Sequence, residues 1–235
     1  MDLSRSRFSE WLAQPSLDAD LKEELLAIAE DPDAIEDAFG CELQFGTGGL
    51  RGILGAGTNR MNIHVVRRAA QATADVLNAA GLPRRAAIGY DSRIGSERFA
   101  RETACVMAGN GIKVRLFDAL RPTPELSFAV REYHAIAGVN VTASHNPKEY
   151  NGYKVYWEDG AQLPPHHASA IAAKMDELDI FDSIHLADYD EAVRNGMITL
   201  IGDETDEKFL ANVMAQVNDP ESVKKVADNF SIIFT

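Results

Sequence analysis

Short apolar segments that alternate with helix-length segments limit this chain to a narrow set of folds. The clearest apolar segments are residues 85–90, 113–117 and 135–141, and helical patterns lie between them. Strands that alternate with helices in this way predict βαβ units and a mainly parallel sheet covered on both faces. We therefore expect a three-layer α/β/α fold with a mixed, mainly parallel sheet. In such sheets ligands bind beyond the carboxyl ends of the strands.

Three segments of different character divide the chain. Residues 1–40 place apolar side chains at helical spacing with acids between them, which predicts an N-terminal helical extension. Residues 41–202 contain the strand–helix alternation and are expected to form the main α/β domain. Residues 203–235 open with an acidic helical pattern and end in the apolar run NFSIIFT, which is typical of a strand. We expect this last segment to begin a second α/β domain, truncated here from a longer protein.

Helix starts and stops are marked by ordinary capping residues. Asn62 is expected to cap a helix over residues 63–80, and Ser96 to cap a second helix that runs to Asn110. Gly111 then has the position of a helix-terminating glycine.

Charge and composition exclude several classes of protein. The 235 residues carry a formal net charge of −13, which argues against non-specific nucleic-acid binding. Residues 41–157 are nevertheless basic, with a net charge of +6, and this segment is suited to an anion. No apolar run approaches the ~20 residues of a membrane span, and the N-terminus lacks the apolar core of a signal peptide. Cys41 and Cys105 match no metal or redox spacing, so a cytoplasmic location is expected.

A glycine-rich run occupies residues 46–57, GTGGLRGILGAG. Its spacing departs from the dinucleotide-binding pattern, and no Gly-Lys-Ser/Thr follows as in a P-loop. What remains is flexible backbone around Arg51. Glycines let backbone amides approach an anion, and a guanidinium binds phosphate through two hydrogen bonds. A tight structural turn explains the run equally well.

A second polar segment, residues 142–151, directly follows the apolar run 135–141. It presents Ser144 at a strand's carboxyl end, with His145, Lys148 and Lys154 close in sequence. Taken alone, the segment is more typical of an ordinary Ser/Asn turn than of a site. A serine hydrolase would need a G-x-S-x-G elbow, which is absent. Ser144 and His145 are adjacent and poorly placed to act as a direct nucleophile–base pair, which leaves a base from elsewhere in the chain as the alternative.

Three acidic or histidine clusters are weaker metal candidates. They are His166-His167, Asp188-x-Asp190 and the run 203–207. Loop polarity and acidic helix starts explain these clusters better than metal binding does.

Five motifs in order carry a resemblance to a known family. They are residues 45–52 (FGTGGLRG), 89–93 (GYDSR), 121–125 (RPTPE), 142–147 (TASHNP) and 151–154 (NGYK). Together they resemble the N-terminal part of the α-D-phosphohexomutases, the family of phosphoglucomutase and phosphomannomutase. The acidic extension and residues 55–62 are most similar to the longer phosphoglucomutase type, whose relatives include phosphopentomutases.

The resemblance implies a function and a set of site residues. Ser144 would be the phosphoserine that exchanges a phosphoryl group as hexose 1-phosphate and hexose 6-phosphate interconvert through a 1,6-bisphosphate. Glucose is the favoured hexose. Arg51, His145 and Lys154 match catalytic positions, and the implied phosphate-binding residues are Thr47, Gly48, Asn146, Arg51 and Lys154. The implied cofactors are Mg²⁺, bound in part by the phosphoryl oxygen on Ser144, and glucose 1,6-bisphosphate as activator. The implied partners are the sugar phosphate and the remaining domains of a four-domain enzyme.

The chain also departs from the family pattern. An Asp-Gly-Asp-x-Asp-Arg metal loop does not occur in it, nor do the sugar-selecting and C-terminal phosphate-binding loops. We therefore expect residues 1–235 alone to have little mutase activity. The alternative is a non-catalytic domain that binds or senses a sugar phosphate.

Overall fold

The computed structural model describes residues 3–81 and 84–233. These residues fall into two units, Met1–Ile201 and Gly202–Thr235, which we describe separately.

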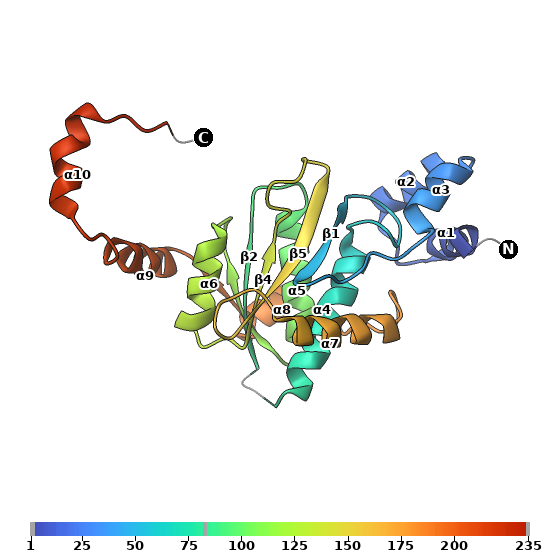
Figure 1. The fold of residues 1–235 in the computed structure, drawn as a ribbon. Helices are drawn as coiled ribbons and strands as arrows, with labels where there is room; N and C mark the ends of the chain where they lie inside the picture. Colours follow the sequence, from blue (N-terminus) through green and yellow to red (C-terminus); the bar gives the residue numbers. More distant parts are fainter. Residues whose placement is uncertain (1–2, 82–83, 234–235) are drawn as a thin grey trace. The chain divides into compact units, whose positions relative to one another are not determined.

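A six-stranded sheet organises the first unit (Figure 1). Its strands are β1 (Gly49–Ile53), β2 (Arg85–Tyr90), β3 (Lys113–Phe117), β4 (Ala137–Val141), β5 (Tyr150–Trp157) and β6 (Ile198–Ile201). Their spatial order is β1-β5-β4-β2-β3-β6. Strands β4, β2, β3 and β6 pair in parallel, whereas β5 is antiparallel to both β4 and β1. The expected mixed, mainly parallel sheet is therefore confirmed.

Helices cover both faces of this sheet. The first face packs against α4 (Ile63–Ala79), α5 (Ser96–Gly109), α7 (Pro165–Glu177) and α8 (Tyr189–Arg194). The second face packs against α6 (Thr123–Glu132), where Leu126 and Val130 meet Ala87, Phe117 and Tyr156 from the strands. The three-layer arrangement is thus confirmed. No helix in residues 3–81 and 84–233 is both long and apolar enough to cross a lipid bilayer.

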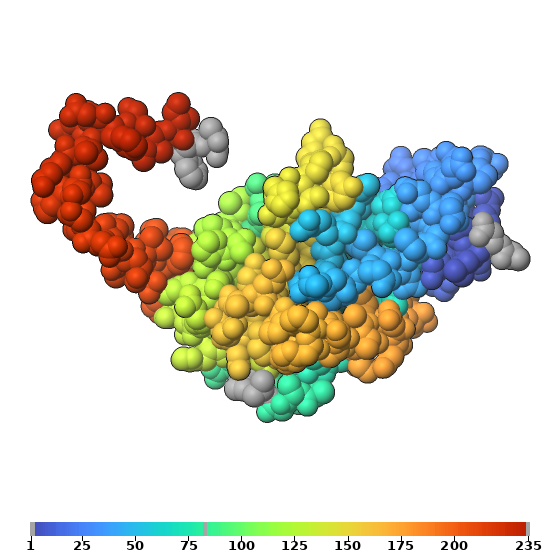
Figure 2. Space-filling model, viewed as in Figure 1, coloured from blue at the N-terminus to red at the C-terminus, as the bar shows by residue number. Residues whose placement is uncertain are grey.

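The N-terminal residues form three helices, α1 (Leu3–Ala13), α2 (Ala19–Ile28) and α3 (Pro32–Phe39). They belong to the first unit and pack against it (Figure 2). Trp11 lies edge-on to Phe39, His64 and Phe181, with ring centroids 5.3–5.6 Å apart. The expected helical extension is therefore anchored to α4 by buried aromatic rings.

Three local expectations meet different outcomes. Asn62 caps α4 as expected, since its side chain accepts a hydrogen bond from the Val65 amide at 3.0 Å. The cap at Ser96 was wrong: Gly95, with φ +79°, is the N-cap residue of α5, and the Ser96 hydroxyl instead donates to Asp91. The glycine run, expected to be flexible backbone, contains strand β1 because β5 supplies its hydrogen-bonding partner.

The second unit contains α9 (Asp203–Met214), α10 (Pro220–Val226) and a 3₁₀ turn, Ala227–Asn229. The expectation of a strand over residues 229–235 was wrong for its described part, since residues 230–233 have no strand structure. Residues 234 and 235 lie outside the described residues. A strand needs a partner for its backbone groups, and the described residues of this unit include no strand that could pair with it.

Candidate active site

The loop after β4 holds Ser144 in a backbone conformation that residues other than glycine rarely adopt. Its φ is +58°, in the left-handed region, and the residue is exposed. The Ser144 amide donates to Thr142 Oγ1 at 2.9 Å, and the Asn146 amide donates to the Ala143 carbonyl at 3.2 Å. Backbone strain of this kind persists only where surrounding contacts impose it, and it gathers at functional sites. The segment around this loop projects from the surface of the first unit (yellow in Figure 2).

The guanidinium of Arg93 imposes that conformation. It donates to four carbonyl oxygens of the loop: those of Ser144 at 2.8 Å, Asn146 at 2.6 Å, Pro147 at 2.8 Å and Tyr150 at 3.0 Å. Guanidinium donors form a rigid planar fork, so one side chain fixes the positions of several loop atoms at once. Arg93 therefore holds the serine loop in shape and is not free to bind a substrate with those donors.

A polar network fixes Arg93 in turn. The Asp91 carboxylate accepts from the Arg93 amide at 3.0 Å and from the Ser96 hydroxyl at 2.8 Å. Its other oxygen lies 3.5 Å from Arg93 Nε. The buried Asn151 amide donates to Ser96 Oγ and to the Ile94 carbonyl, both at 3.0 Å. The loops after β2 and β4 are thus joined into one unit.

A hollow of about 440 Å³ lies between these two loops. Its lining includes Asp91, Ser92, Arg93, Ser144, Asn146 and Lys148. Asn146 Oδ1 is buried and has no hydrogen-bond partner among the described residues. A small ligand at Ser144 would therefore meet a cation, and a hydroxyl on it could donate to the unused Asn146 oxygen.

Two cations lie on one face of the sheet next to this loop. Arg51 on β1 is directly opposite Gly152 on β5, and Lys154 is two residues further along β5, so both side chains are on the face that α6 covers. The pKa of Lys154 is lowered from its usual value, first by burial and then by the charge of Arg51, while Asp91 opposes the shift. A lysine with a lowered pKa can exchange a proton more readily at neutral pH.

The remaining expected site residues divide into two groups. His145 and Lys148 are exposed beside Ser144 in the same loop. Thr47 and Gly48 lie further from it: the Gly48 carbonyl accepts from the Val155 amide at 2.9 Å. Val155 is three residues beyond Gly152 on β5, an offset of about 10 Å along the strand. The structure therefore brings Arg51, Lys154, His145 and Asn146 towards Ser144. Thr47 and Gly48 lie further away, about 10 Å along β5 from Gly152.

The described residues do not form a metal site by themselves. Residues 3–81 and 84–233 include no group of three or more His, Cys, Asp or Glu side chains placed to hold a metal ion. His167 stacks on Trp157 with ring centroids 3.9 Å apart, and Asp188 caps α8. Asp91, the carboxylate near Ser144, is engaged by Arg93 and Ser96.

Sequence reasoning did not include Arg93 among the site residues. The signal was present, because Asp91-Ser92-Arg93 directly follows a strand in a loop at the carboxyl edge of the sheet. What the sequence hid is that its contacts are with carbonyl groups 51–57 residues away.

Comparisons with known proteins show which family this chain is similar to. Residues 42–180 match the family model for phosphoglucomutase/phosphomannomutase, α/β/α domain I. A phosphoglucomutase from Staphylococcus saprophyticus is 38% identical over 175 residues, which cover 74% of this chain and 32% of the relative. A Schizosaccharomyces pombe relative with a phosphoribomutase name is 41% identical over 178 residues, covering 70% of this chain and 30% of the relative.

A solved structure described as a phosphomannomutase of Thermus thermophilus aligns with a TM-score of 0.57 at 33% identity. The alignment covers 63% of this chain and 32% of that one. The chain spans about a third of the length of these relatives.

Proposed function

Since the chain belongs to the phosphoglucomutase/phosphomannomutase family through its α/β/α domain I, we propose that Ser144 carries a phosphoryl group between two oxygens of a hexose phosphate. Hexose 1-phosphate would become hexose 6-phosphate through a 1,6-bisphosphate. Glucose is the favoured sugar because the first relatives are phosphoglucomutases. We assign this chemistry to residues 41–202.

One observation carries the proposal: a strained, exposed serine at a strand's carboxyl end, with Arg51 and Lys154 on the neighbouring strands. Phosphoryl transfer depends on positioning and on stabilising negative charge more than on covalent chemistry. A phosphoserine carries a charge of about −1.5 to −2 at pH 7 and therefore needs cations nearby. The Arg93 clamp supplies the positioning, and Arg51, Lys148 and Lys154 supply positive charge.

The proposed transfer consists of two displacements. In the first, the free hydroxyl of the sugar attacks phosphorus on Ser144. The bond between phosphorus and Ser144 Oγ breaks, a bond to the sugar oxygen forms, and the hydroxyl proton passes through a base to the departing Ser144 Oγ. The bisphosphate then reorients, and Ser144 Oγ attacks the other phosphoryl group. The serine is phosphorylated again, and its proton passes back through the base to the sugar oxygen of the isomeric monophosphate that leaves.

Each neighbouring side chain has a distinct part in this scheme. Lys154, with its lowered pKa, is the group we assign to exchanging the hydroxyl proton. Arg51 stabilises charge on the phosphoryl oxygens, and His145 and Asn146 contact the phosphoryl group or the sugar from the loop. Thr47 and Gly48 are assigned to phosphate binding, which requires a substrate that extends past Arg51 to Gly49, the first residue of β1.

The family resemblance implies Mg²⁺ and glucose 1,6-bisphosphate. The described residues do not fit a complete magnesium site, so no step above passes through a metal ion. Glucose 1,6-bisphosphate enters the scheme as the intermediate, and it would also phosphorylate any serine that has lost its phosphoryl group.

Peptide mapping by mass spectrometry tests the proposal directly. The protein is incubated with glucose 1,6-bisphosphate and then digested. One phosphoryl group is expected on Ser144, and none on the Ser144→Ala variant. Ser92→Ala is the matched control, because Ser92 lines the same hollow and is exposed, but has no assigned role. A phosphoryl group on Ser92 instead contradicts the proposal, and a phosphoryl group on neither serine favours the non-catalytic alternative.

Calorimetry distinguishes the alternative. A non-catalytic domain would bind glucose 6-phosphate without any transfer to Ser144, and Ser144→Ala would then bind it as well as the original protein does. Repeating the mapping with mannose and ribose bisphosphates determines the preferred sugar.

A further inference from the structure

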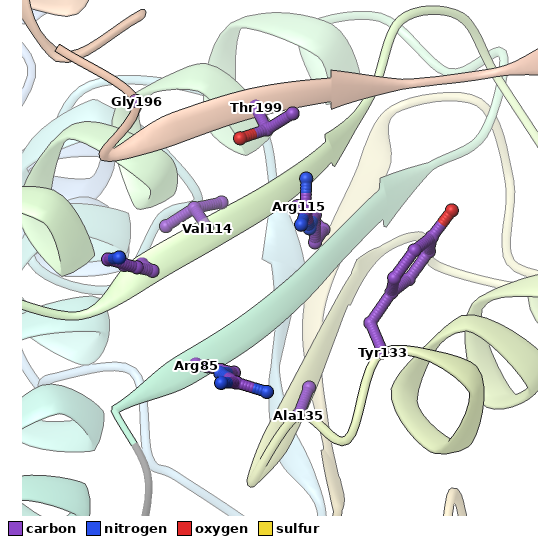
Figure 3. Close-up of a pocket in the computed structure, with 8 residues that line it drawn as sticks. Arg85, Val114, Arg115, Tyr133, Ala135, Gly196 and Thr199 are labelled. Atoms are coloured by element: carbon purple, nitrogen blue, oxygen red, sulfur yellow. The ribbon is translucent and has the colours of Figure 1, made fainter.

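A second basic cavity lies at the amino ends of the parallel strands, the end of the sheet away from Ser144. Its volume is about 260 Å³, and the residues that line it include Arg85, Lys113, Arg115, Tyr133, Gly196 and Thr199 (Figure 3). None of these residues belongs to the site around Ser144, and no motif named above includes them.

The fold brings these residues together at the amino ends of parallel strands. Arg85 and Lys113 begin β2 and β3 and are directly paired, and Arg115 is on the same face as Lys113, two residues further along β3. Thr199 on β6 is paired with Arg115. Helix α6 ends at Glu132 and does not cover the amino ends of β2 and β3, where the cavity forms.

Positive charge is concentrated here without acidic partners. Among the described residues, no carboxylate forms an ion pair with Arg85, Lys113 or Arg115, and no acidic residue lines the cavity. By contrast, Arg67 and Arg68 of the same unit each bind a glutamate, at 2.7 and 2.6 Å. Like charges directly opposite on neighbouring strands repel each other, so this cluster lowers stability while it is empty.

The Arg115 side chain is oriented by an aromatic ring. Its guanidinium carbon lies 5.1 Å from the centroid of Tyr133, and the side chain lies between Tyr133 and Thr199 (Figure 3). A guanidinium held over a ring keeps its N–H groups, which can bind an oxyanion through two hydrogen bonds.

We propose that this cavity binds a small phosphate-bearing anion at a site separate from Ser144. Three cations are enough to neutralise a phosphate or phosphate monoester, whose charge is about −1.5 to −2 at pH 7, and the cavity of about 260 Å³ has room for such an anion. Arg85 and Tyr90 are the two ends of β2, and Ser144 lies beyond the far end, so the two sites are at least about 17 Å apart. Occupancy of one does not sterically exclude occupancy of the other.

Backbone amide shifts measured by NMR test the proposal on the full chain. Inorganic phosphate is titrated first and glucose 6-phosphate second, because the two probes distinguish a free phosphate from a phosphate monoester. Saturable shifts are expected at Lys113, Arg115 and Thr199. The amides of Ser144 and His145 report binding at the other site separately, so failure here is distinguishable from failure of the function proposed above.

Single substitutions identify the cavity as the source of those shifts. Arg115→Gln and Lys113→Gln are each expected to weaken binding at these amides about tenfold, the usual effect of losing a charged hydrogen bond. The matched control is Arg84→Gln, which removes a neighbouring exposed arginine that does not line the cavity. Arg51→Gln should also leave these shifts unchanged.

Three results would overturn the proposal. They are the absence of saturable shifts at these amides, retention of full affinity by both cavity variants, and an equal loss of affinity in Arg84→Gln. Circular dichroism and thermal unfolding of each variant confirm that it is folded. Because Arg115 and Lys113 are tested separately, an unfolded Arg115→Gln protein still leaves Lys113→Gln to decide.

Discussion

The two ends of the sheet use their cations in different ways. At the carboxyl edge, Arg93 and Asp91 are fixed by protein partners, and together they hold a strained serine loop. At the amino edge, Arg85, Lys113 and Arg115 have no carboxylate partner in the described part of the chain. The difference separates cations that shape a site from cations that remain available to a ligand. Lys154 is an intermediate case, since burial and the charge of Arg51 lower its pKa while Asp91 opposes the shift.

Removal of Arg93 should have the largest effect on phosphoryl transfer to Ser144. Arg93→Ala leaves four loop carbonyls without their donor and releases the strain at Ser144. Transfer to Ser144 should fall about 100-fold or more, because small displacements of a reacting group have effects of that size. Stability should fall by about 2 kcal/mol.

Arg98→Ala is the matched control for Arg93. Its exposed ion pairs with Asp18 and Asp20 have no contact with the serine loop, so transfer should be unchanged. Transfer kinetics and urea unfolding of both variants decide the matter. If Arg93→Ala transfers as fast as Arg98→Ala does, Arg93 does not position the loop.

Substitutions at Gly49 and Gly196 test how much backbone constraint exists at the two ends of the sheet. A Cβ at Gly49 would lie 1.8 Å from the Tyr153 carbonyl oxygen, and its φ is +146°. Gly49→Ala should therefore separate β1 from β5 and destabilise the protein by about 3 kcal/mol or more. Gly196, beside the amino-edge cavity, has φ +76° and open space around it. Gly196→Ala should cost only about 1 kcal/mol, as backbone strain. Chemical denaturation measures both, and equal losses would contradict the account.

The pKa of Lys154 provides a third test. Arg51→Gln removes a charge that lowers the pKa of Lys154, so that pKa should rise towards its usual value, whereas Arg51→Lys should keep it low. NMR titration of labelled lysine side chains measures the change.

The same shift has a consequence for stability. Because the folded pKa lies below the unfolded one, the folded protein releases its proton first, and stability rises with pH between the two values. In Arg51→Gln the pH interval between the folded and unfolded pKa values of Lys154 narrows, so the gain in stability across it should be smaller. An unchanged Lys154 titration would mean that Arg51 is not the relevant neighbour.

The smallest effect is expected at the amino edge in the absence of anions. Lys113→Gln relieves repulsion with Arg85 and should raise stability by about 0.3 kcal/mol at low ionic strength. The gain should disappear in ~1 M salt, where screening is nearly complete. Lys174→Gln, which breaks a pair with Glu177, should change stability in the opposite direction. Matching signs for the two lysines would contradict the idea that the cavity cations repel each other.

The sequence allowed the local parts of this fold to be predicted, and non-local contacts account for the errors. Residues 85–90 and 113–117 could be identified as strands, and Asn62 as a cap, because apolar runs and caps are set by neighbouring residues. Strand β1 was missed since its glycines become a strand only through pairing with β5. Ser96 was misassigned because its hydroxyl is drawn to Asp91.

The same distinction applies to the candidate sites. Ser144, Lys154 and Arg51 were proposed from motifs and remain predictions, whereas the clamp by Arg93 depends on carbonyl groups, which carry no sequence signature. The amino-edge cavity was also missed, because Arg85, Lys113 and Arg115 are ordinary residues in separate strands that meet only through sheet register.

The placement of β5 between β1 and β4 has a consequence for biosynthesis. Gly49 pairs with Lys154, so β1 has no β5 partner until about 100 more residues have been made. At ~5–20 residues per second, that interval is roughly 5–20 s. Throughout it the edge of β1 remains open to unwanted pairing. Arg51 can therefore reach its position only after β5 has been made.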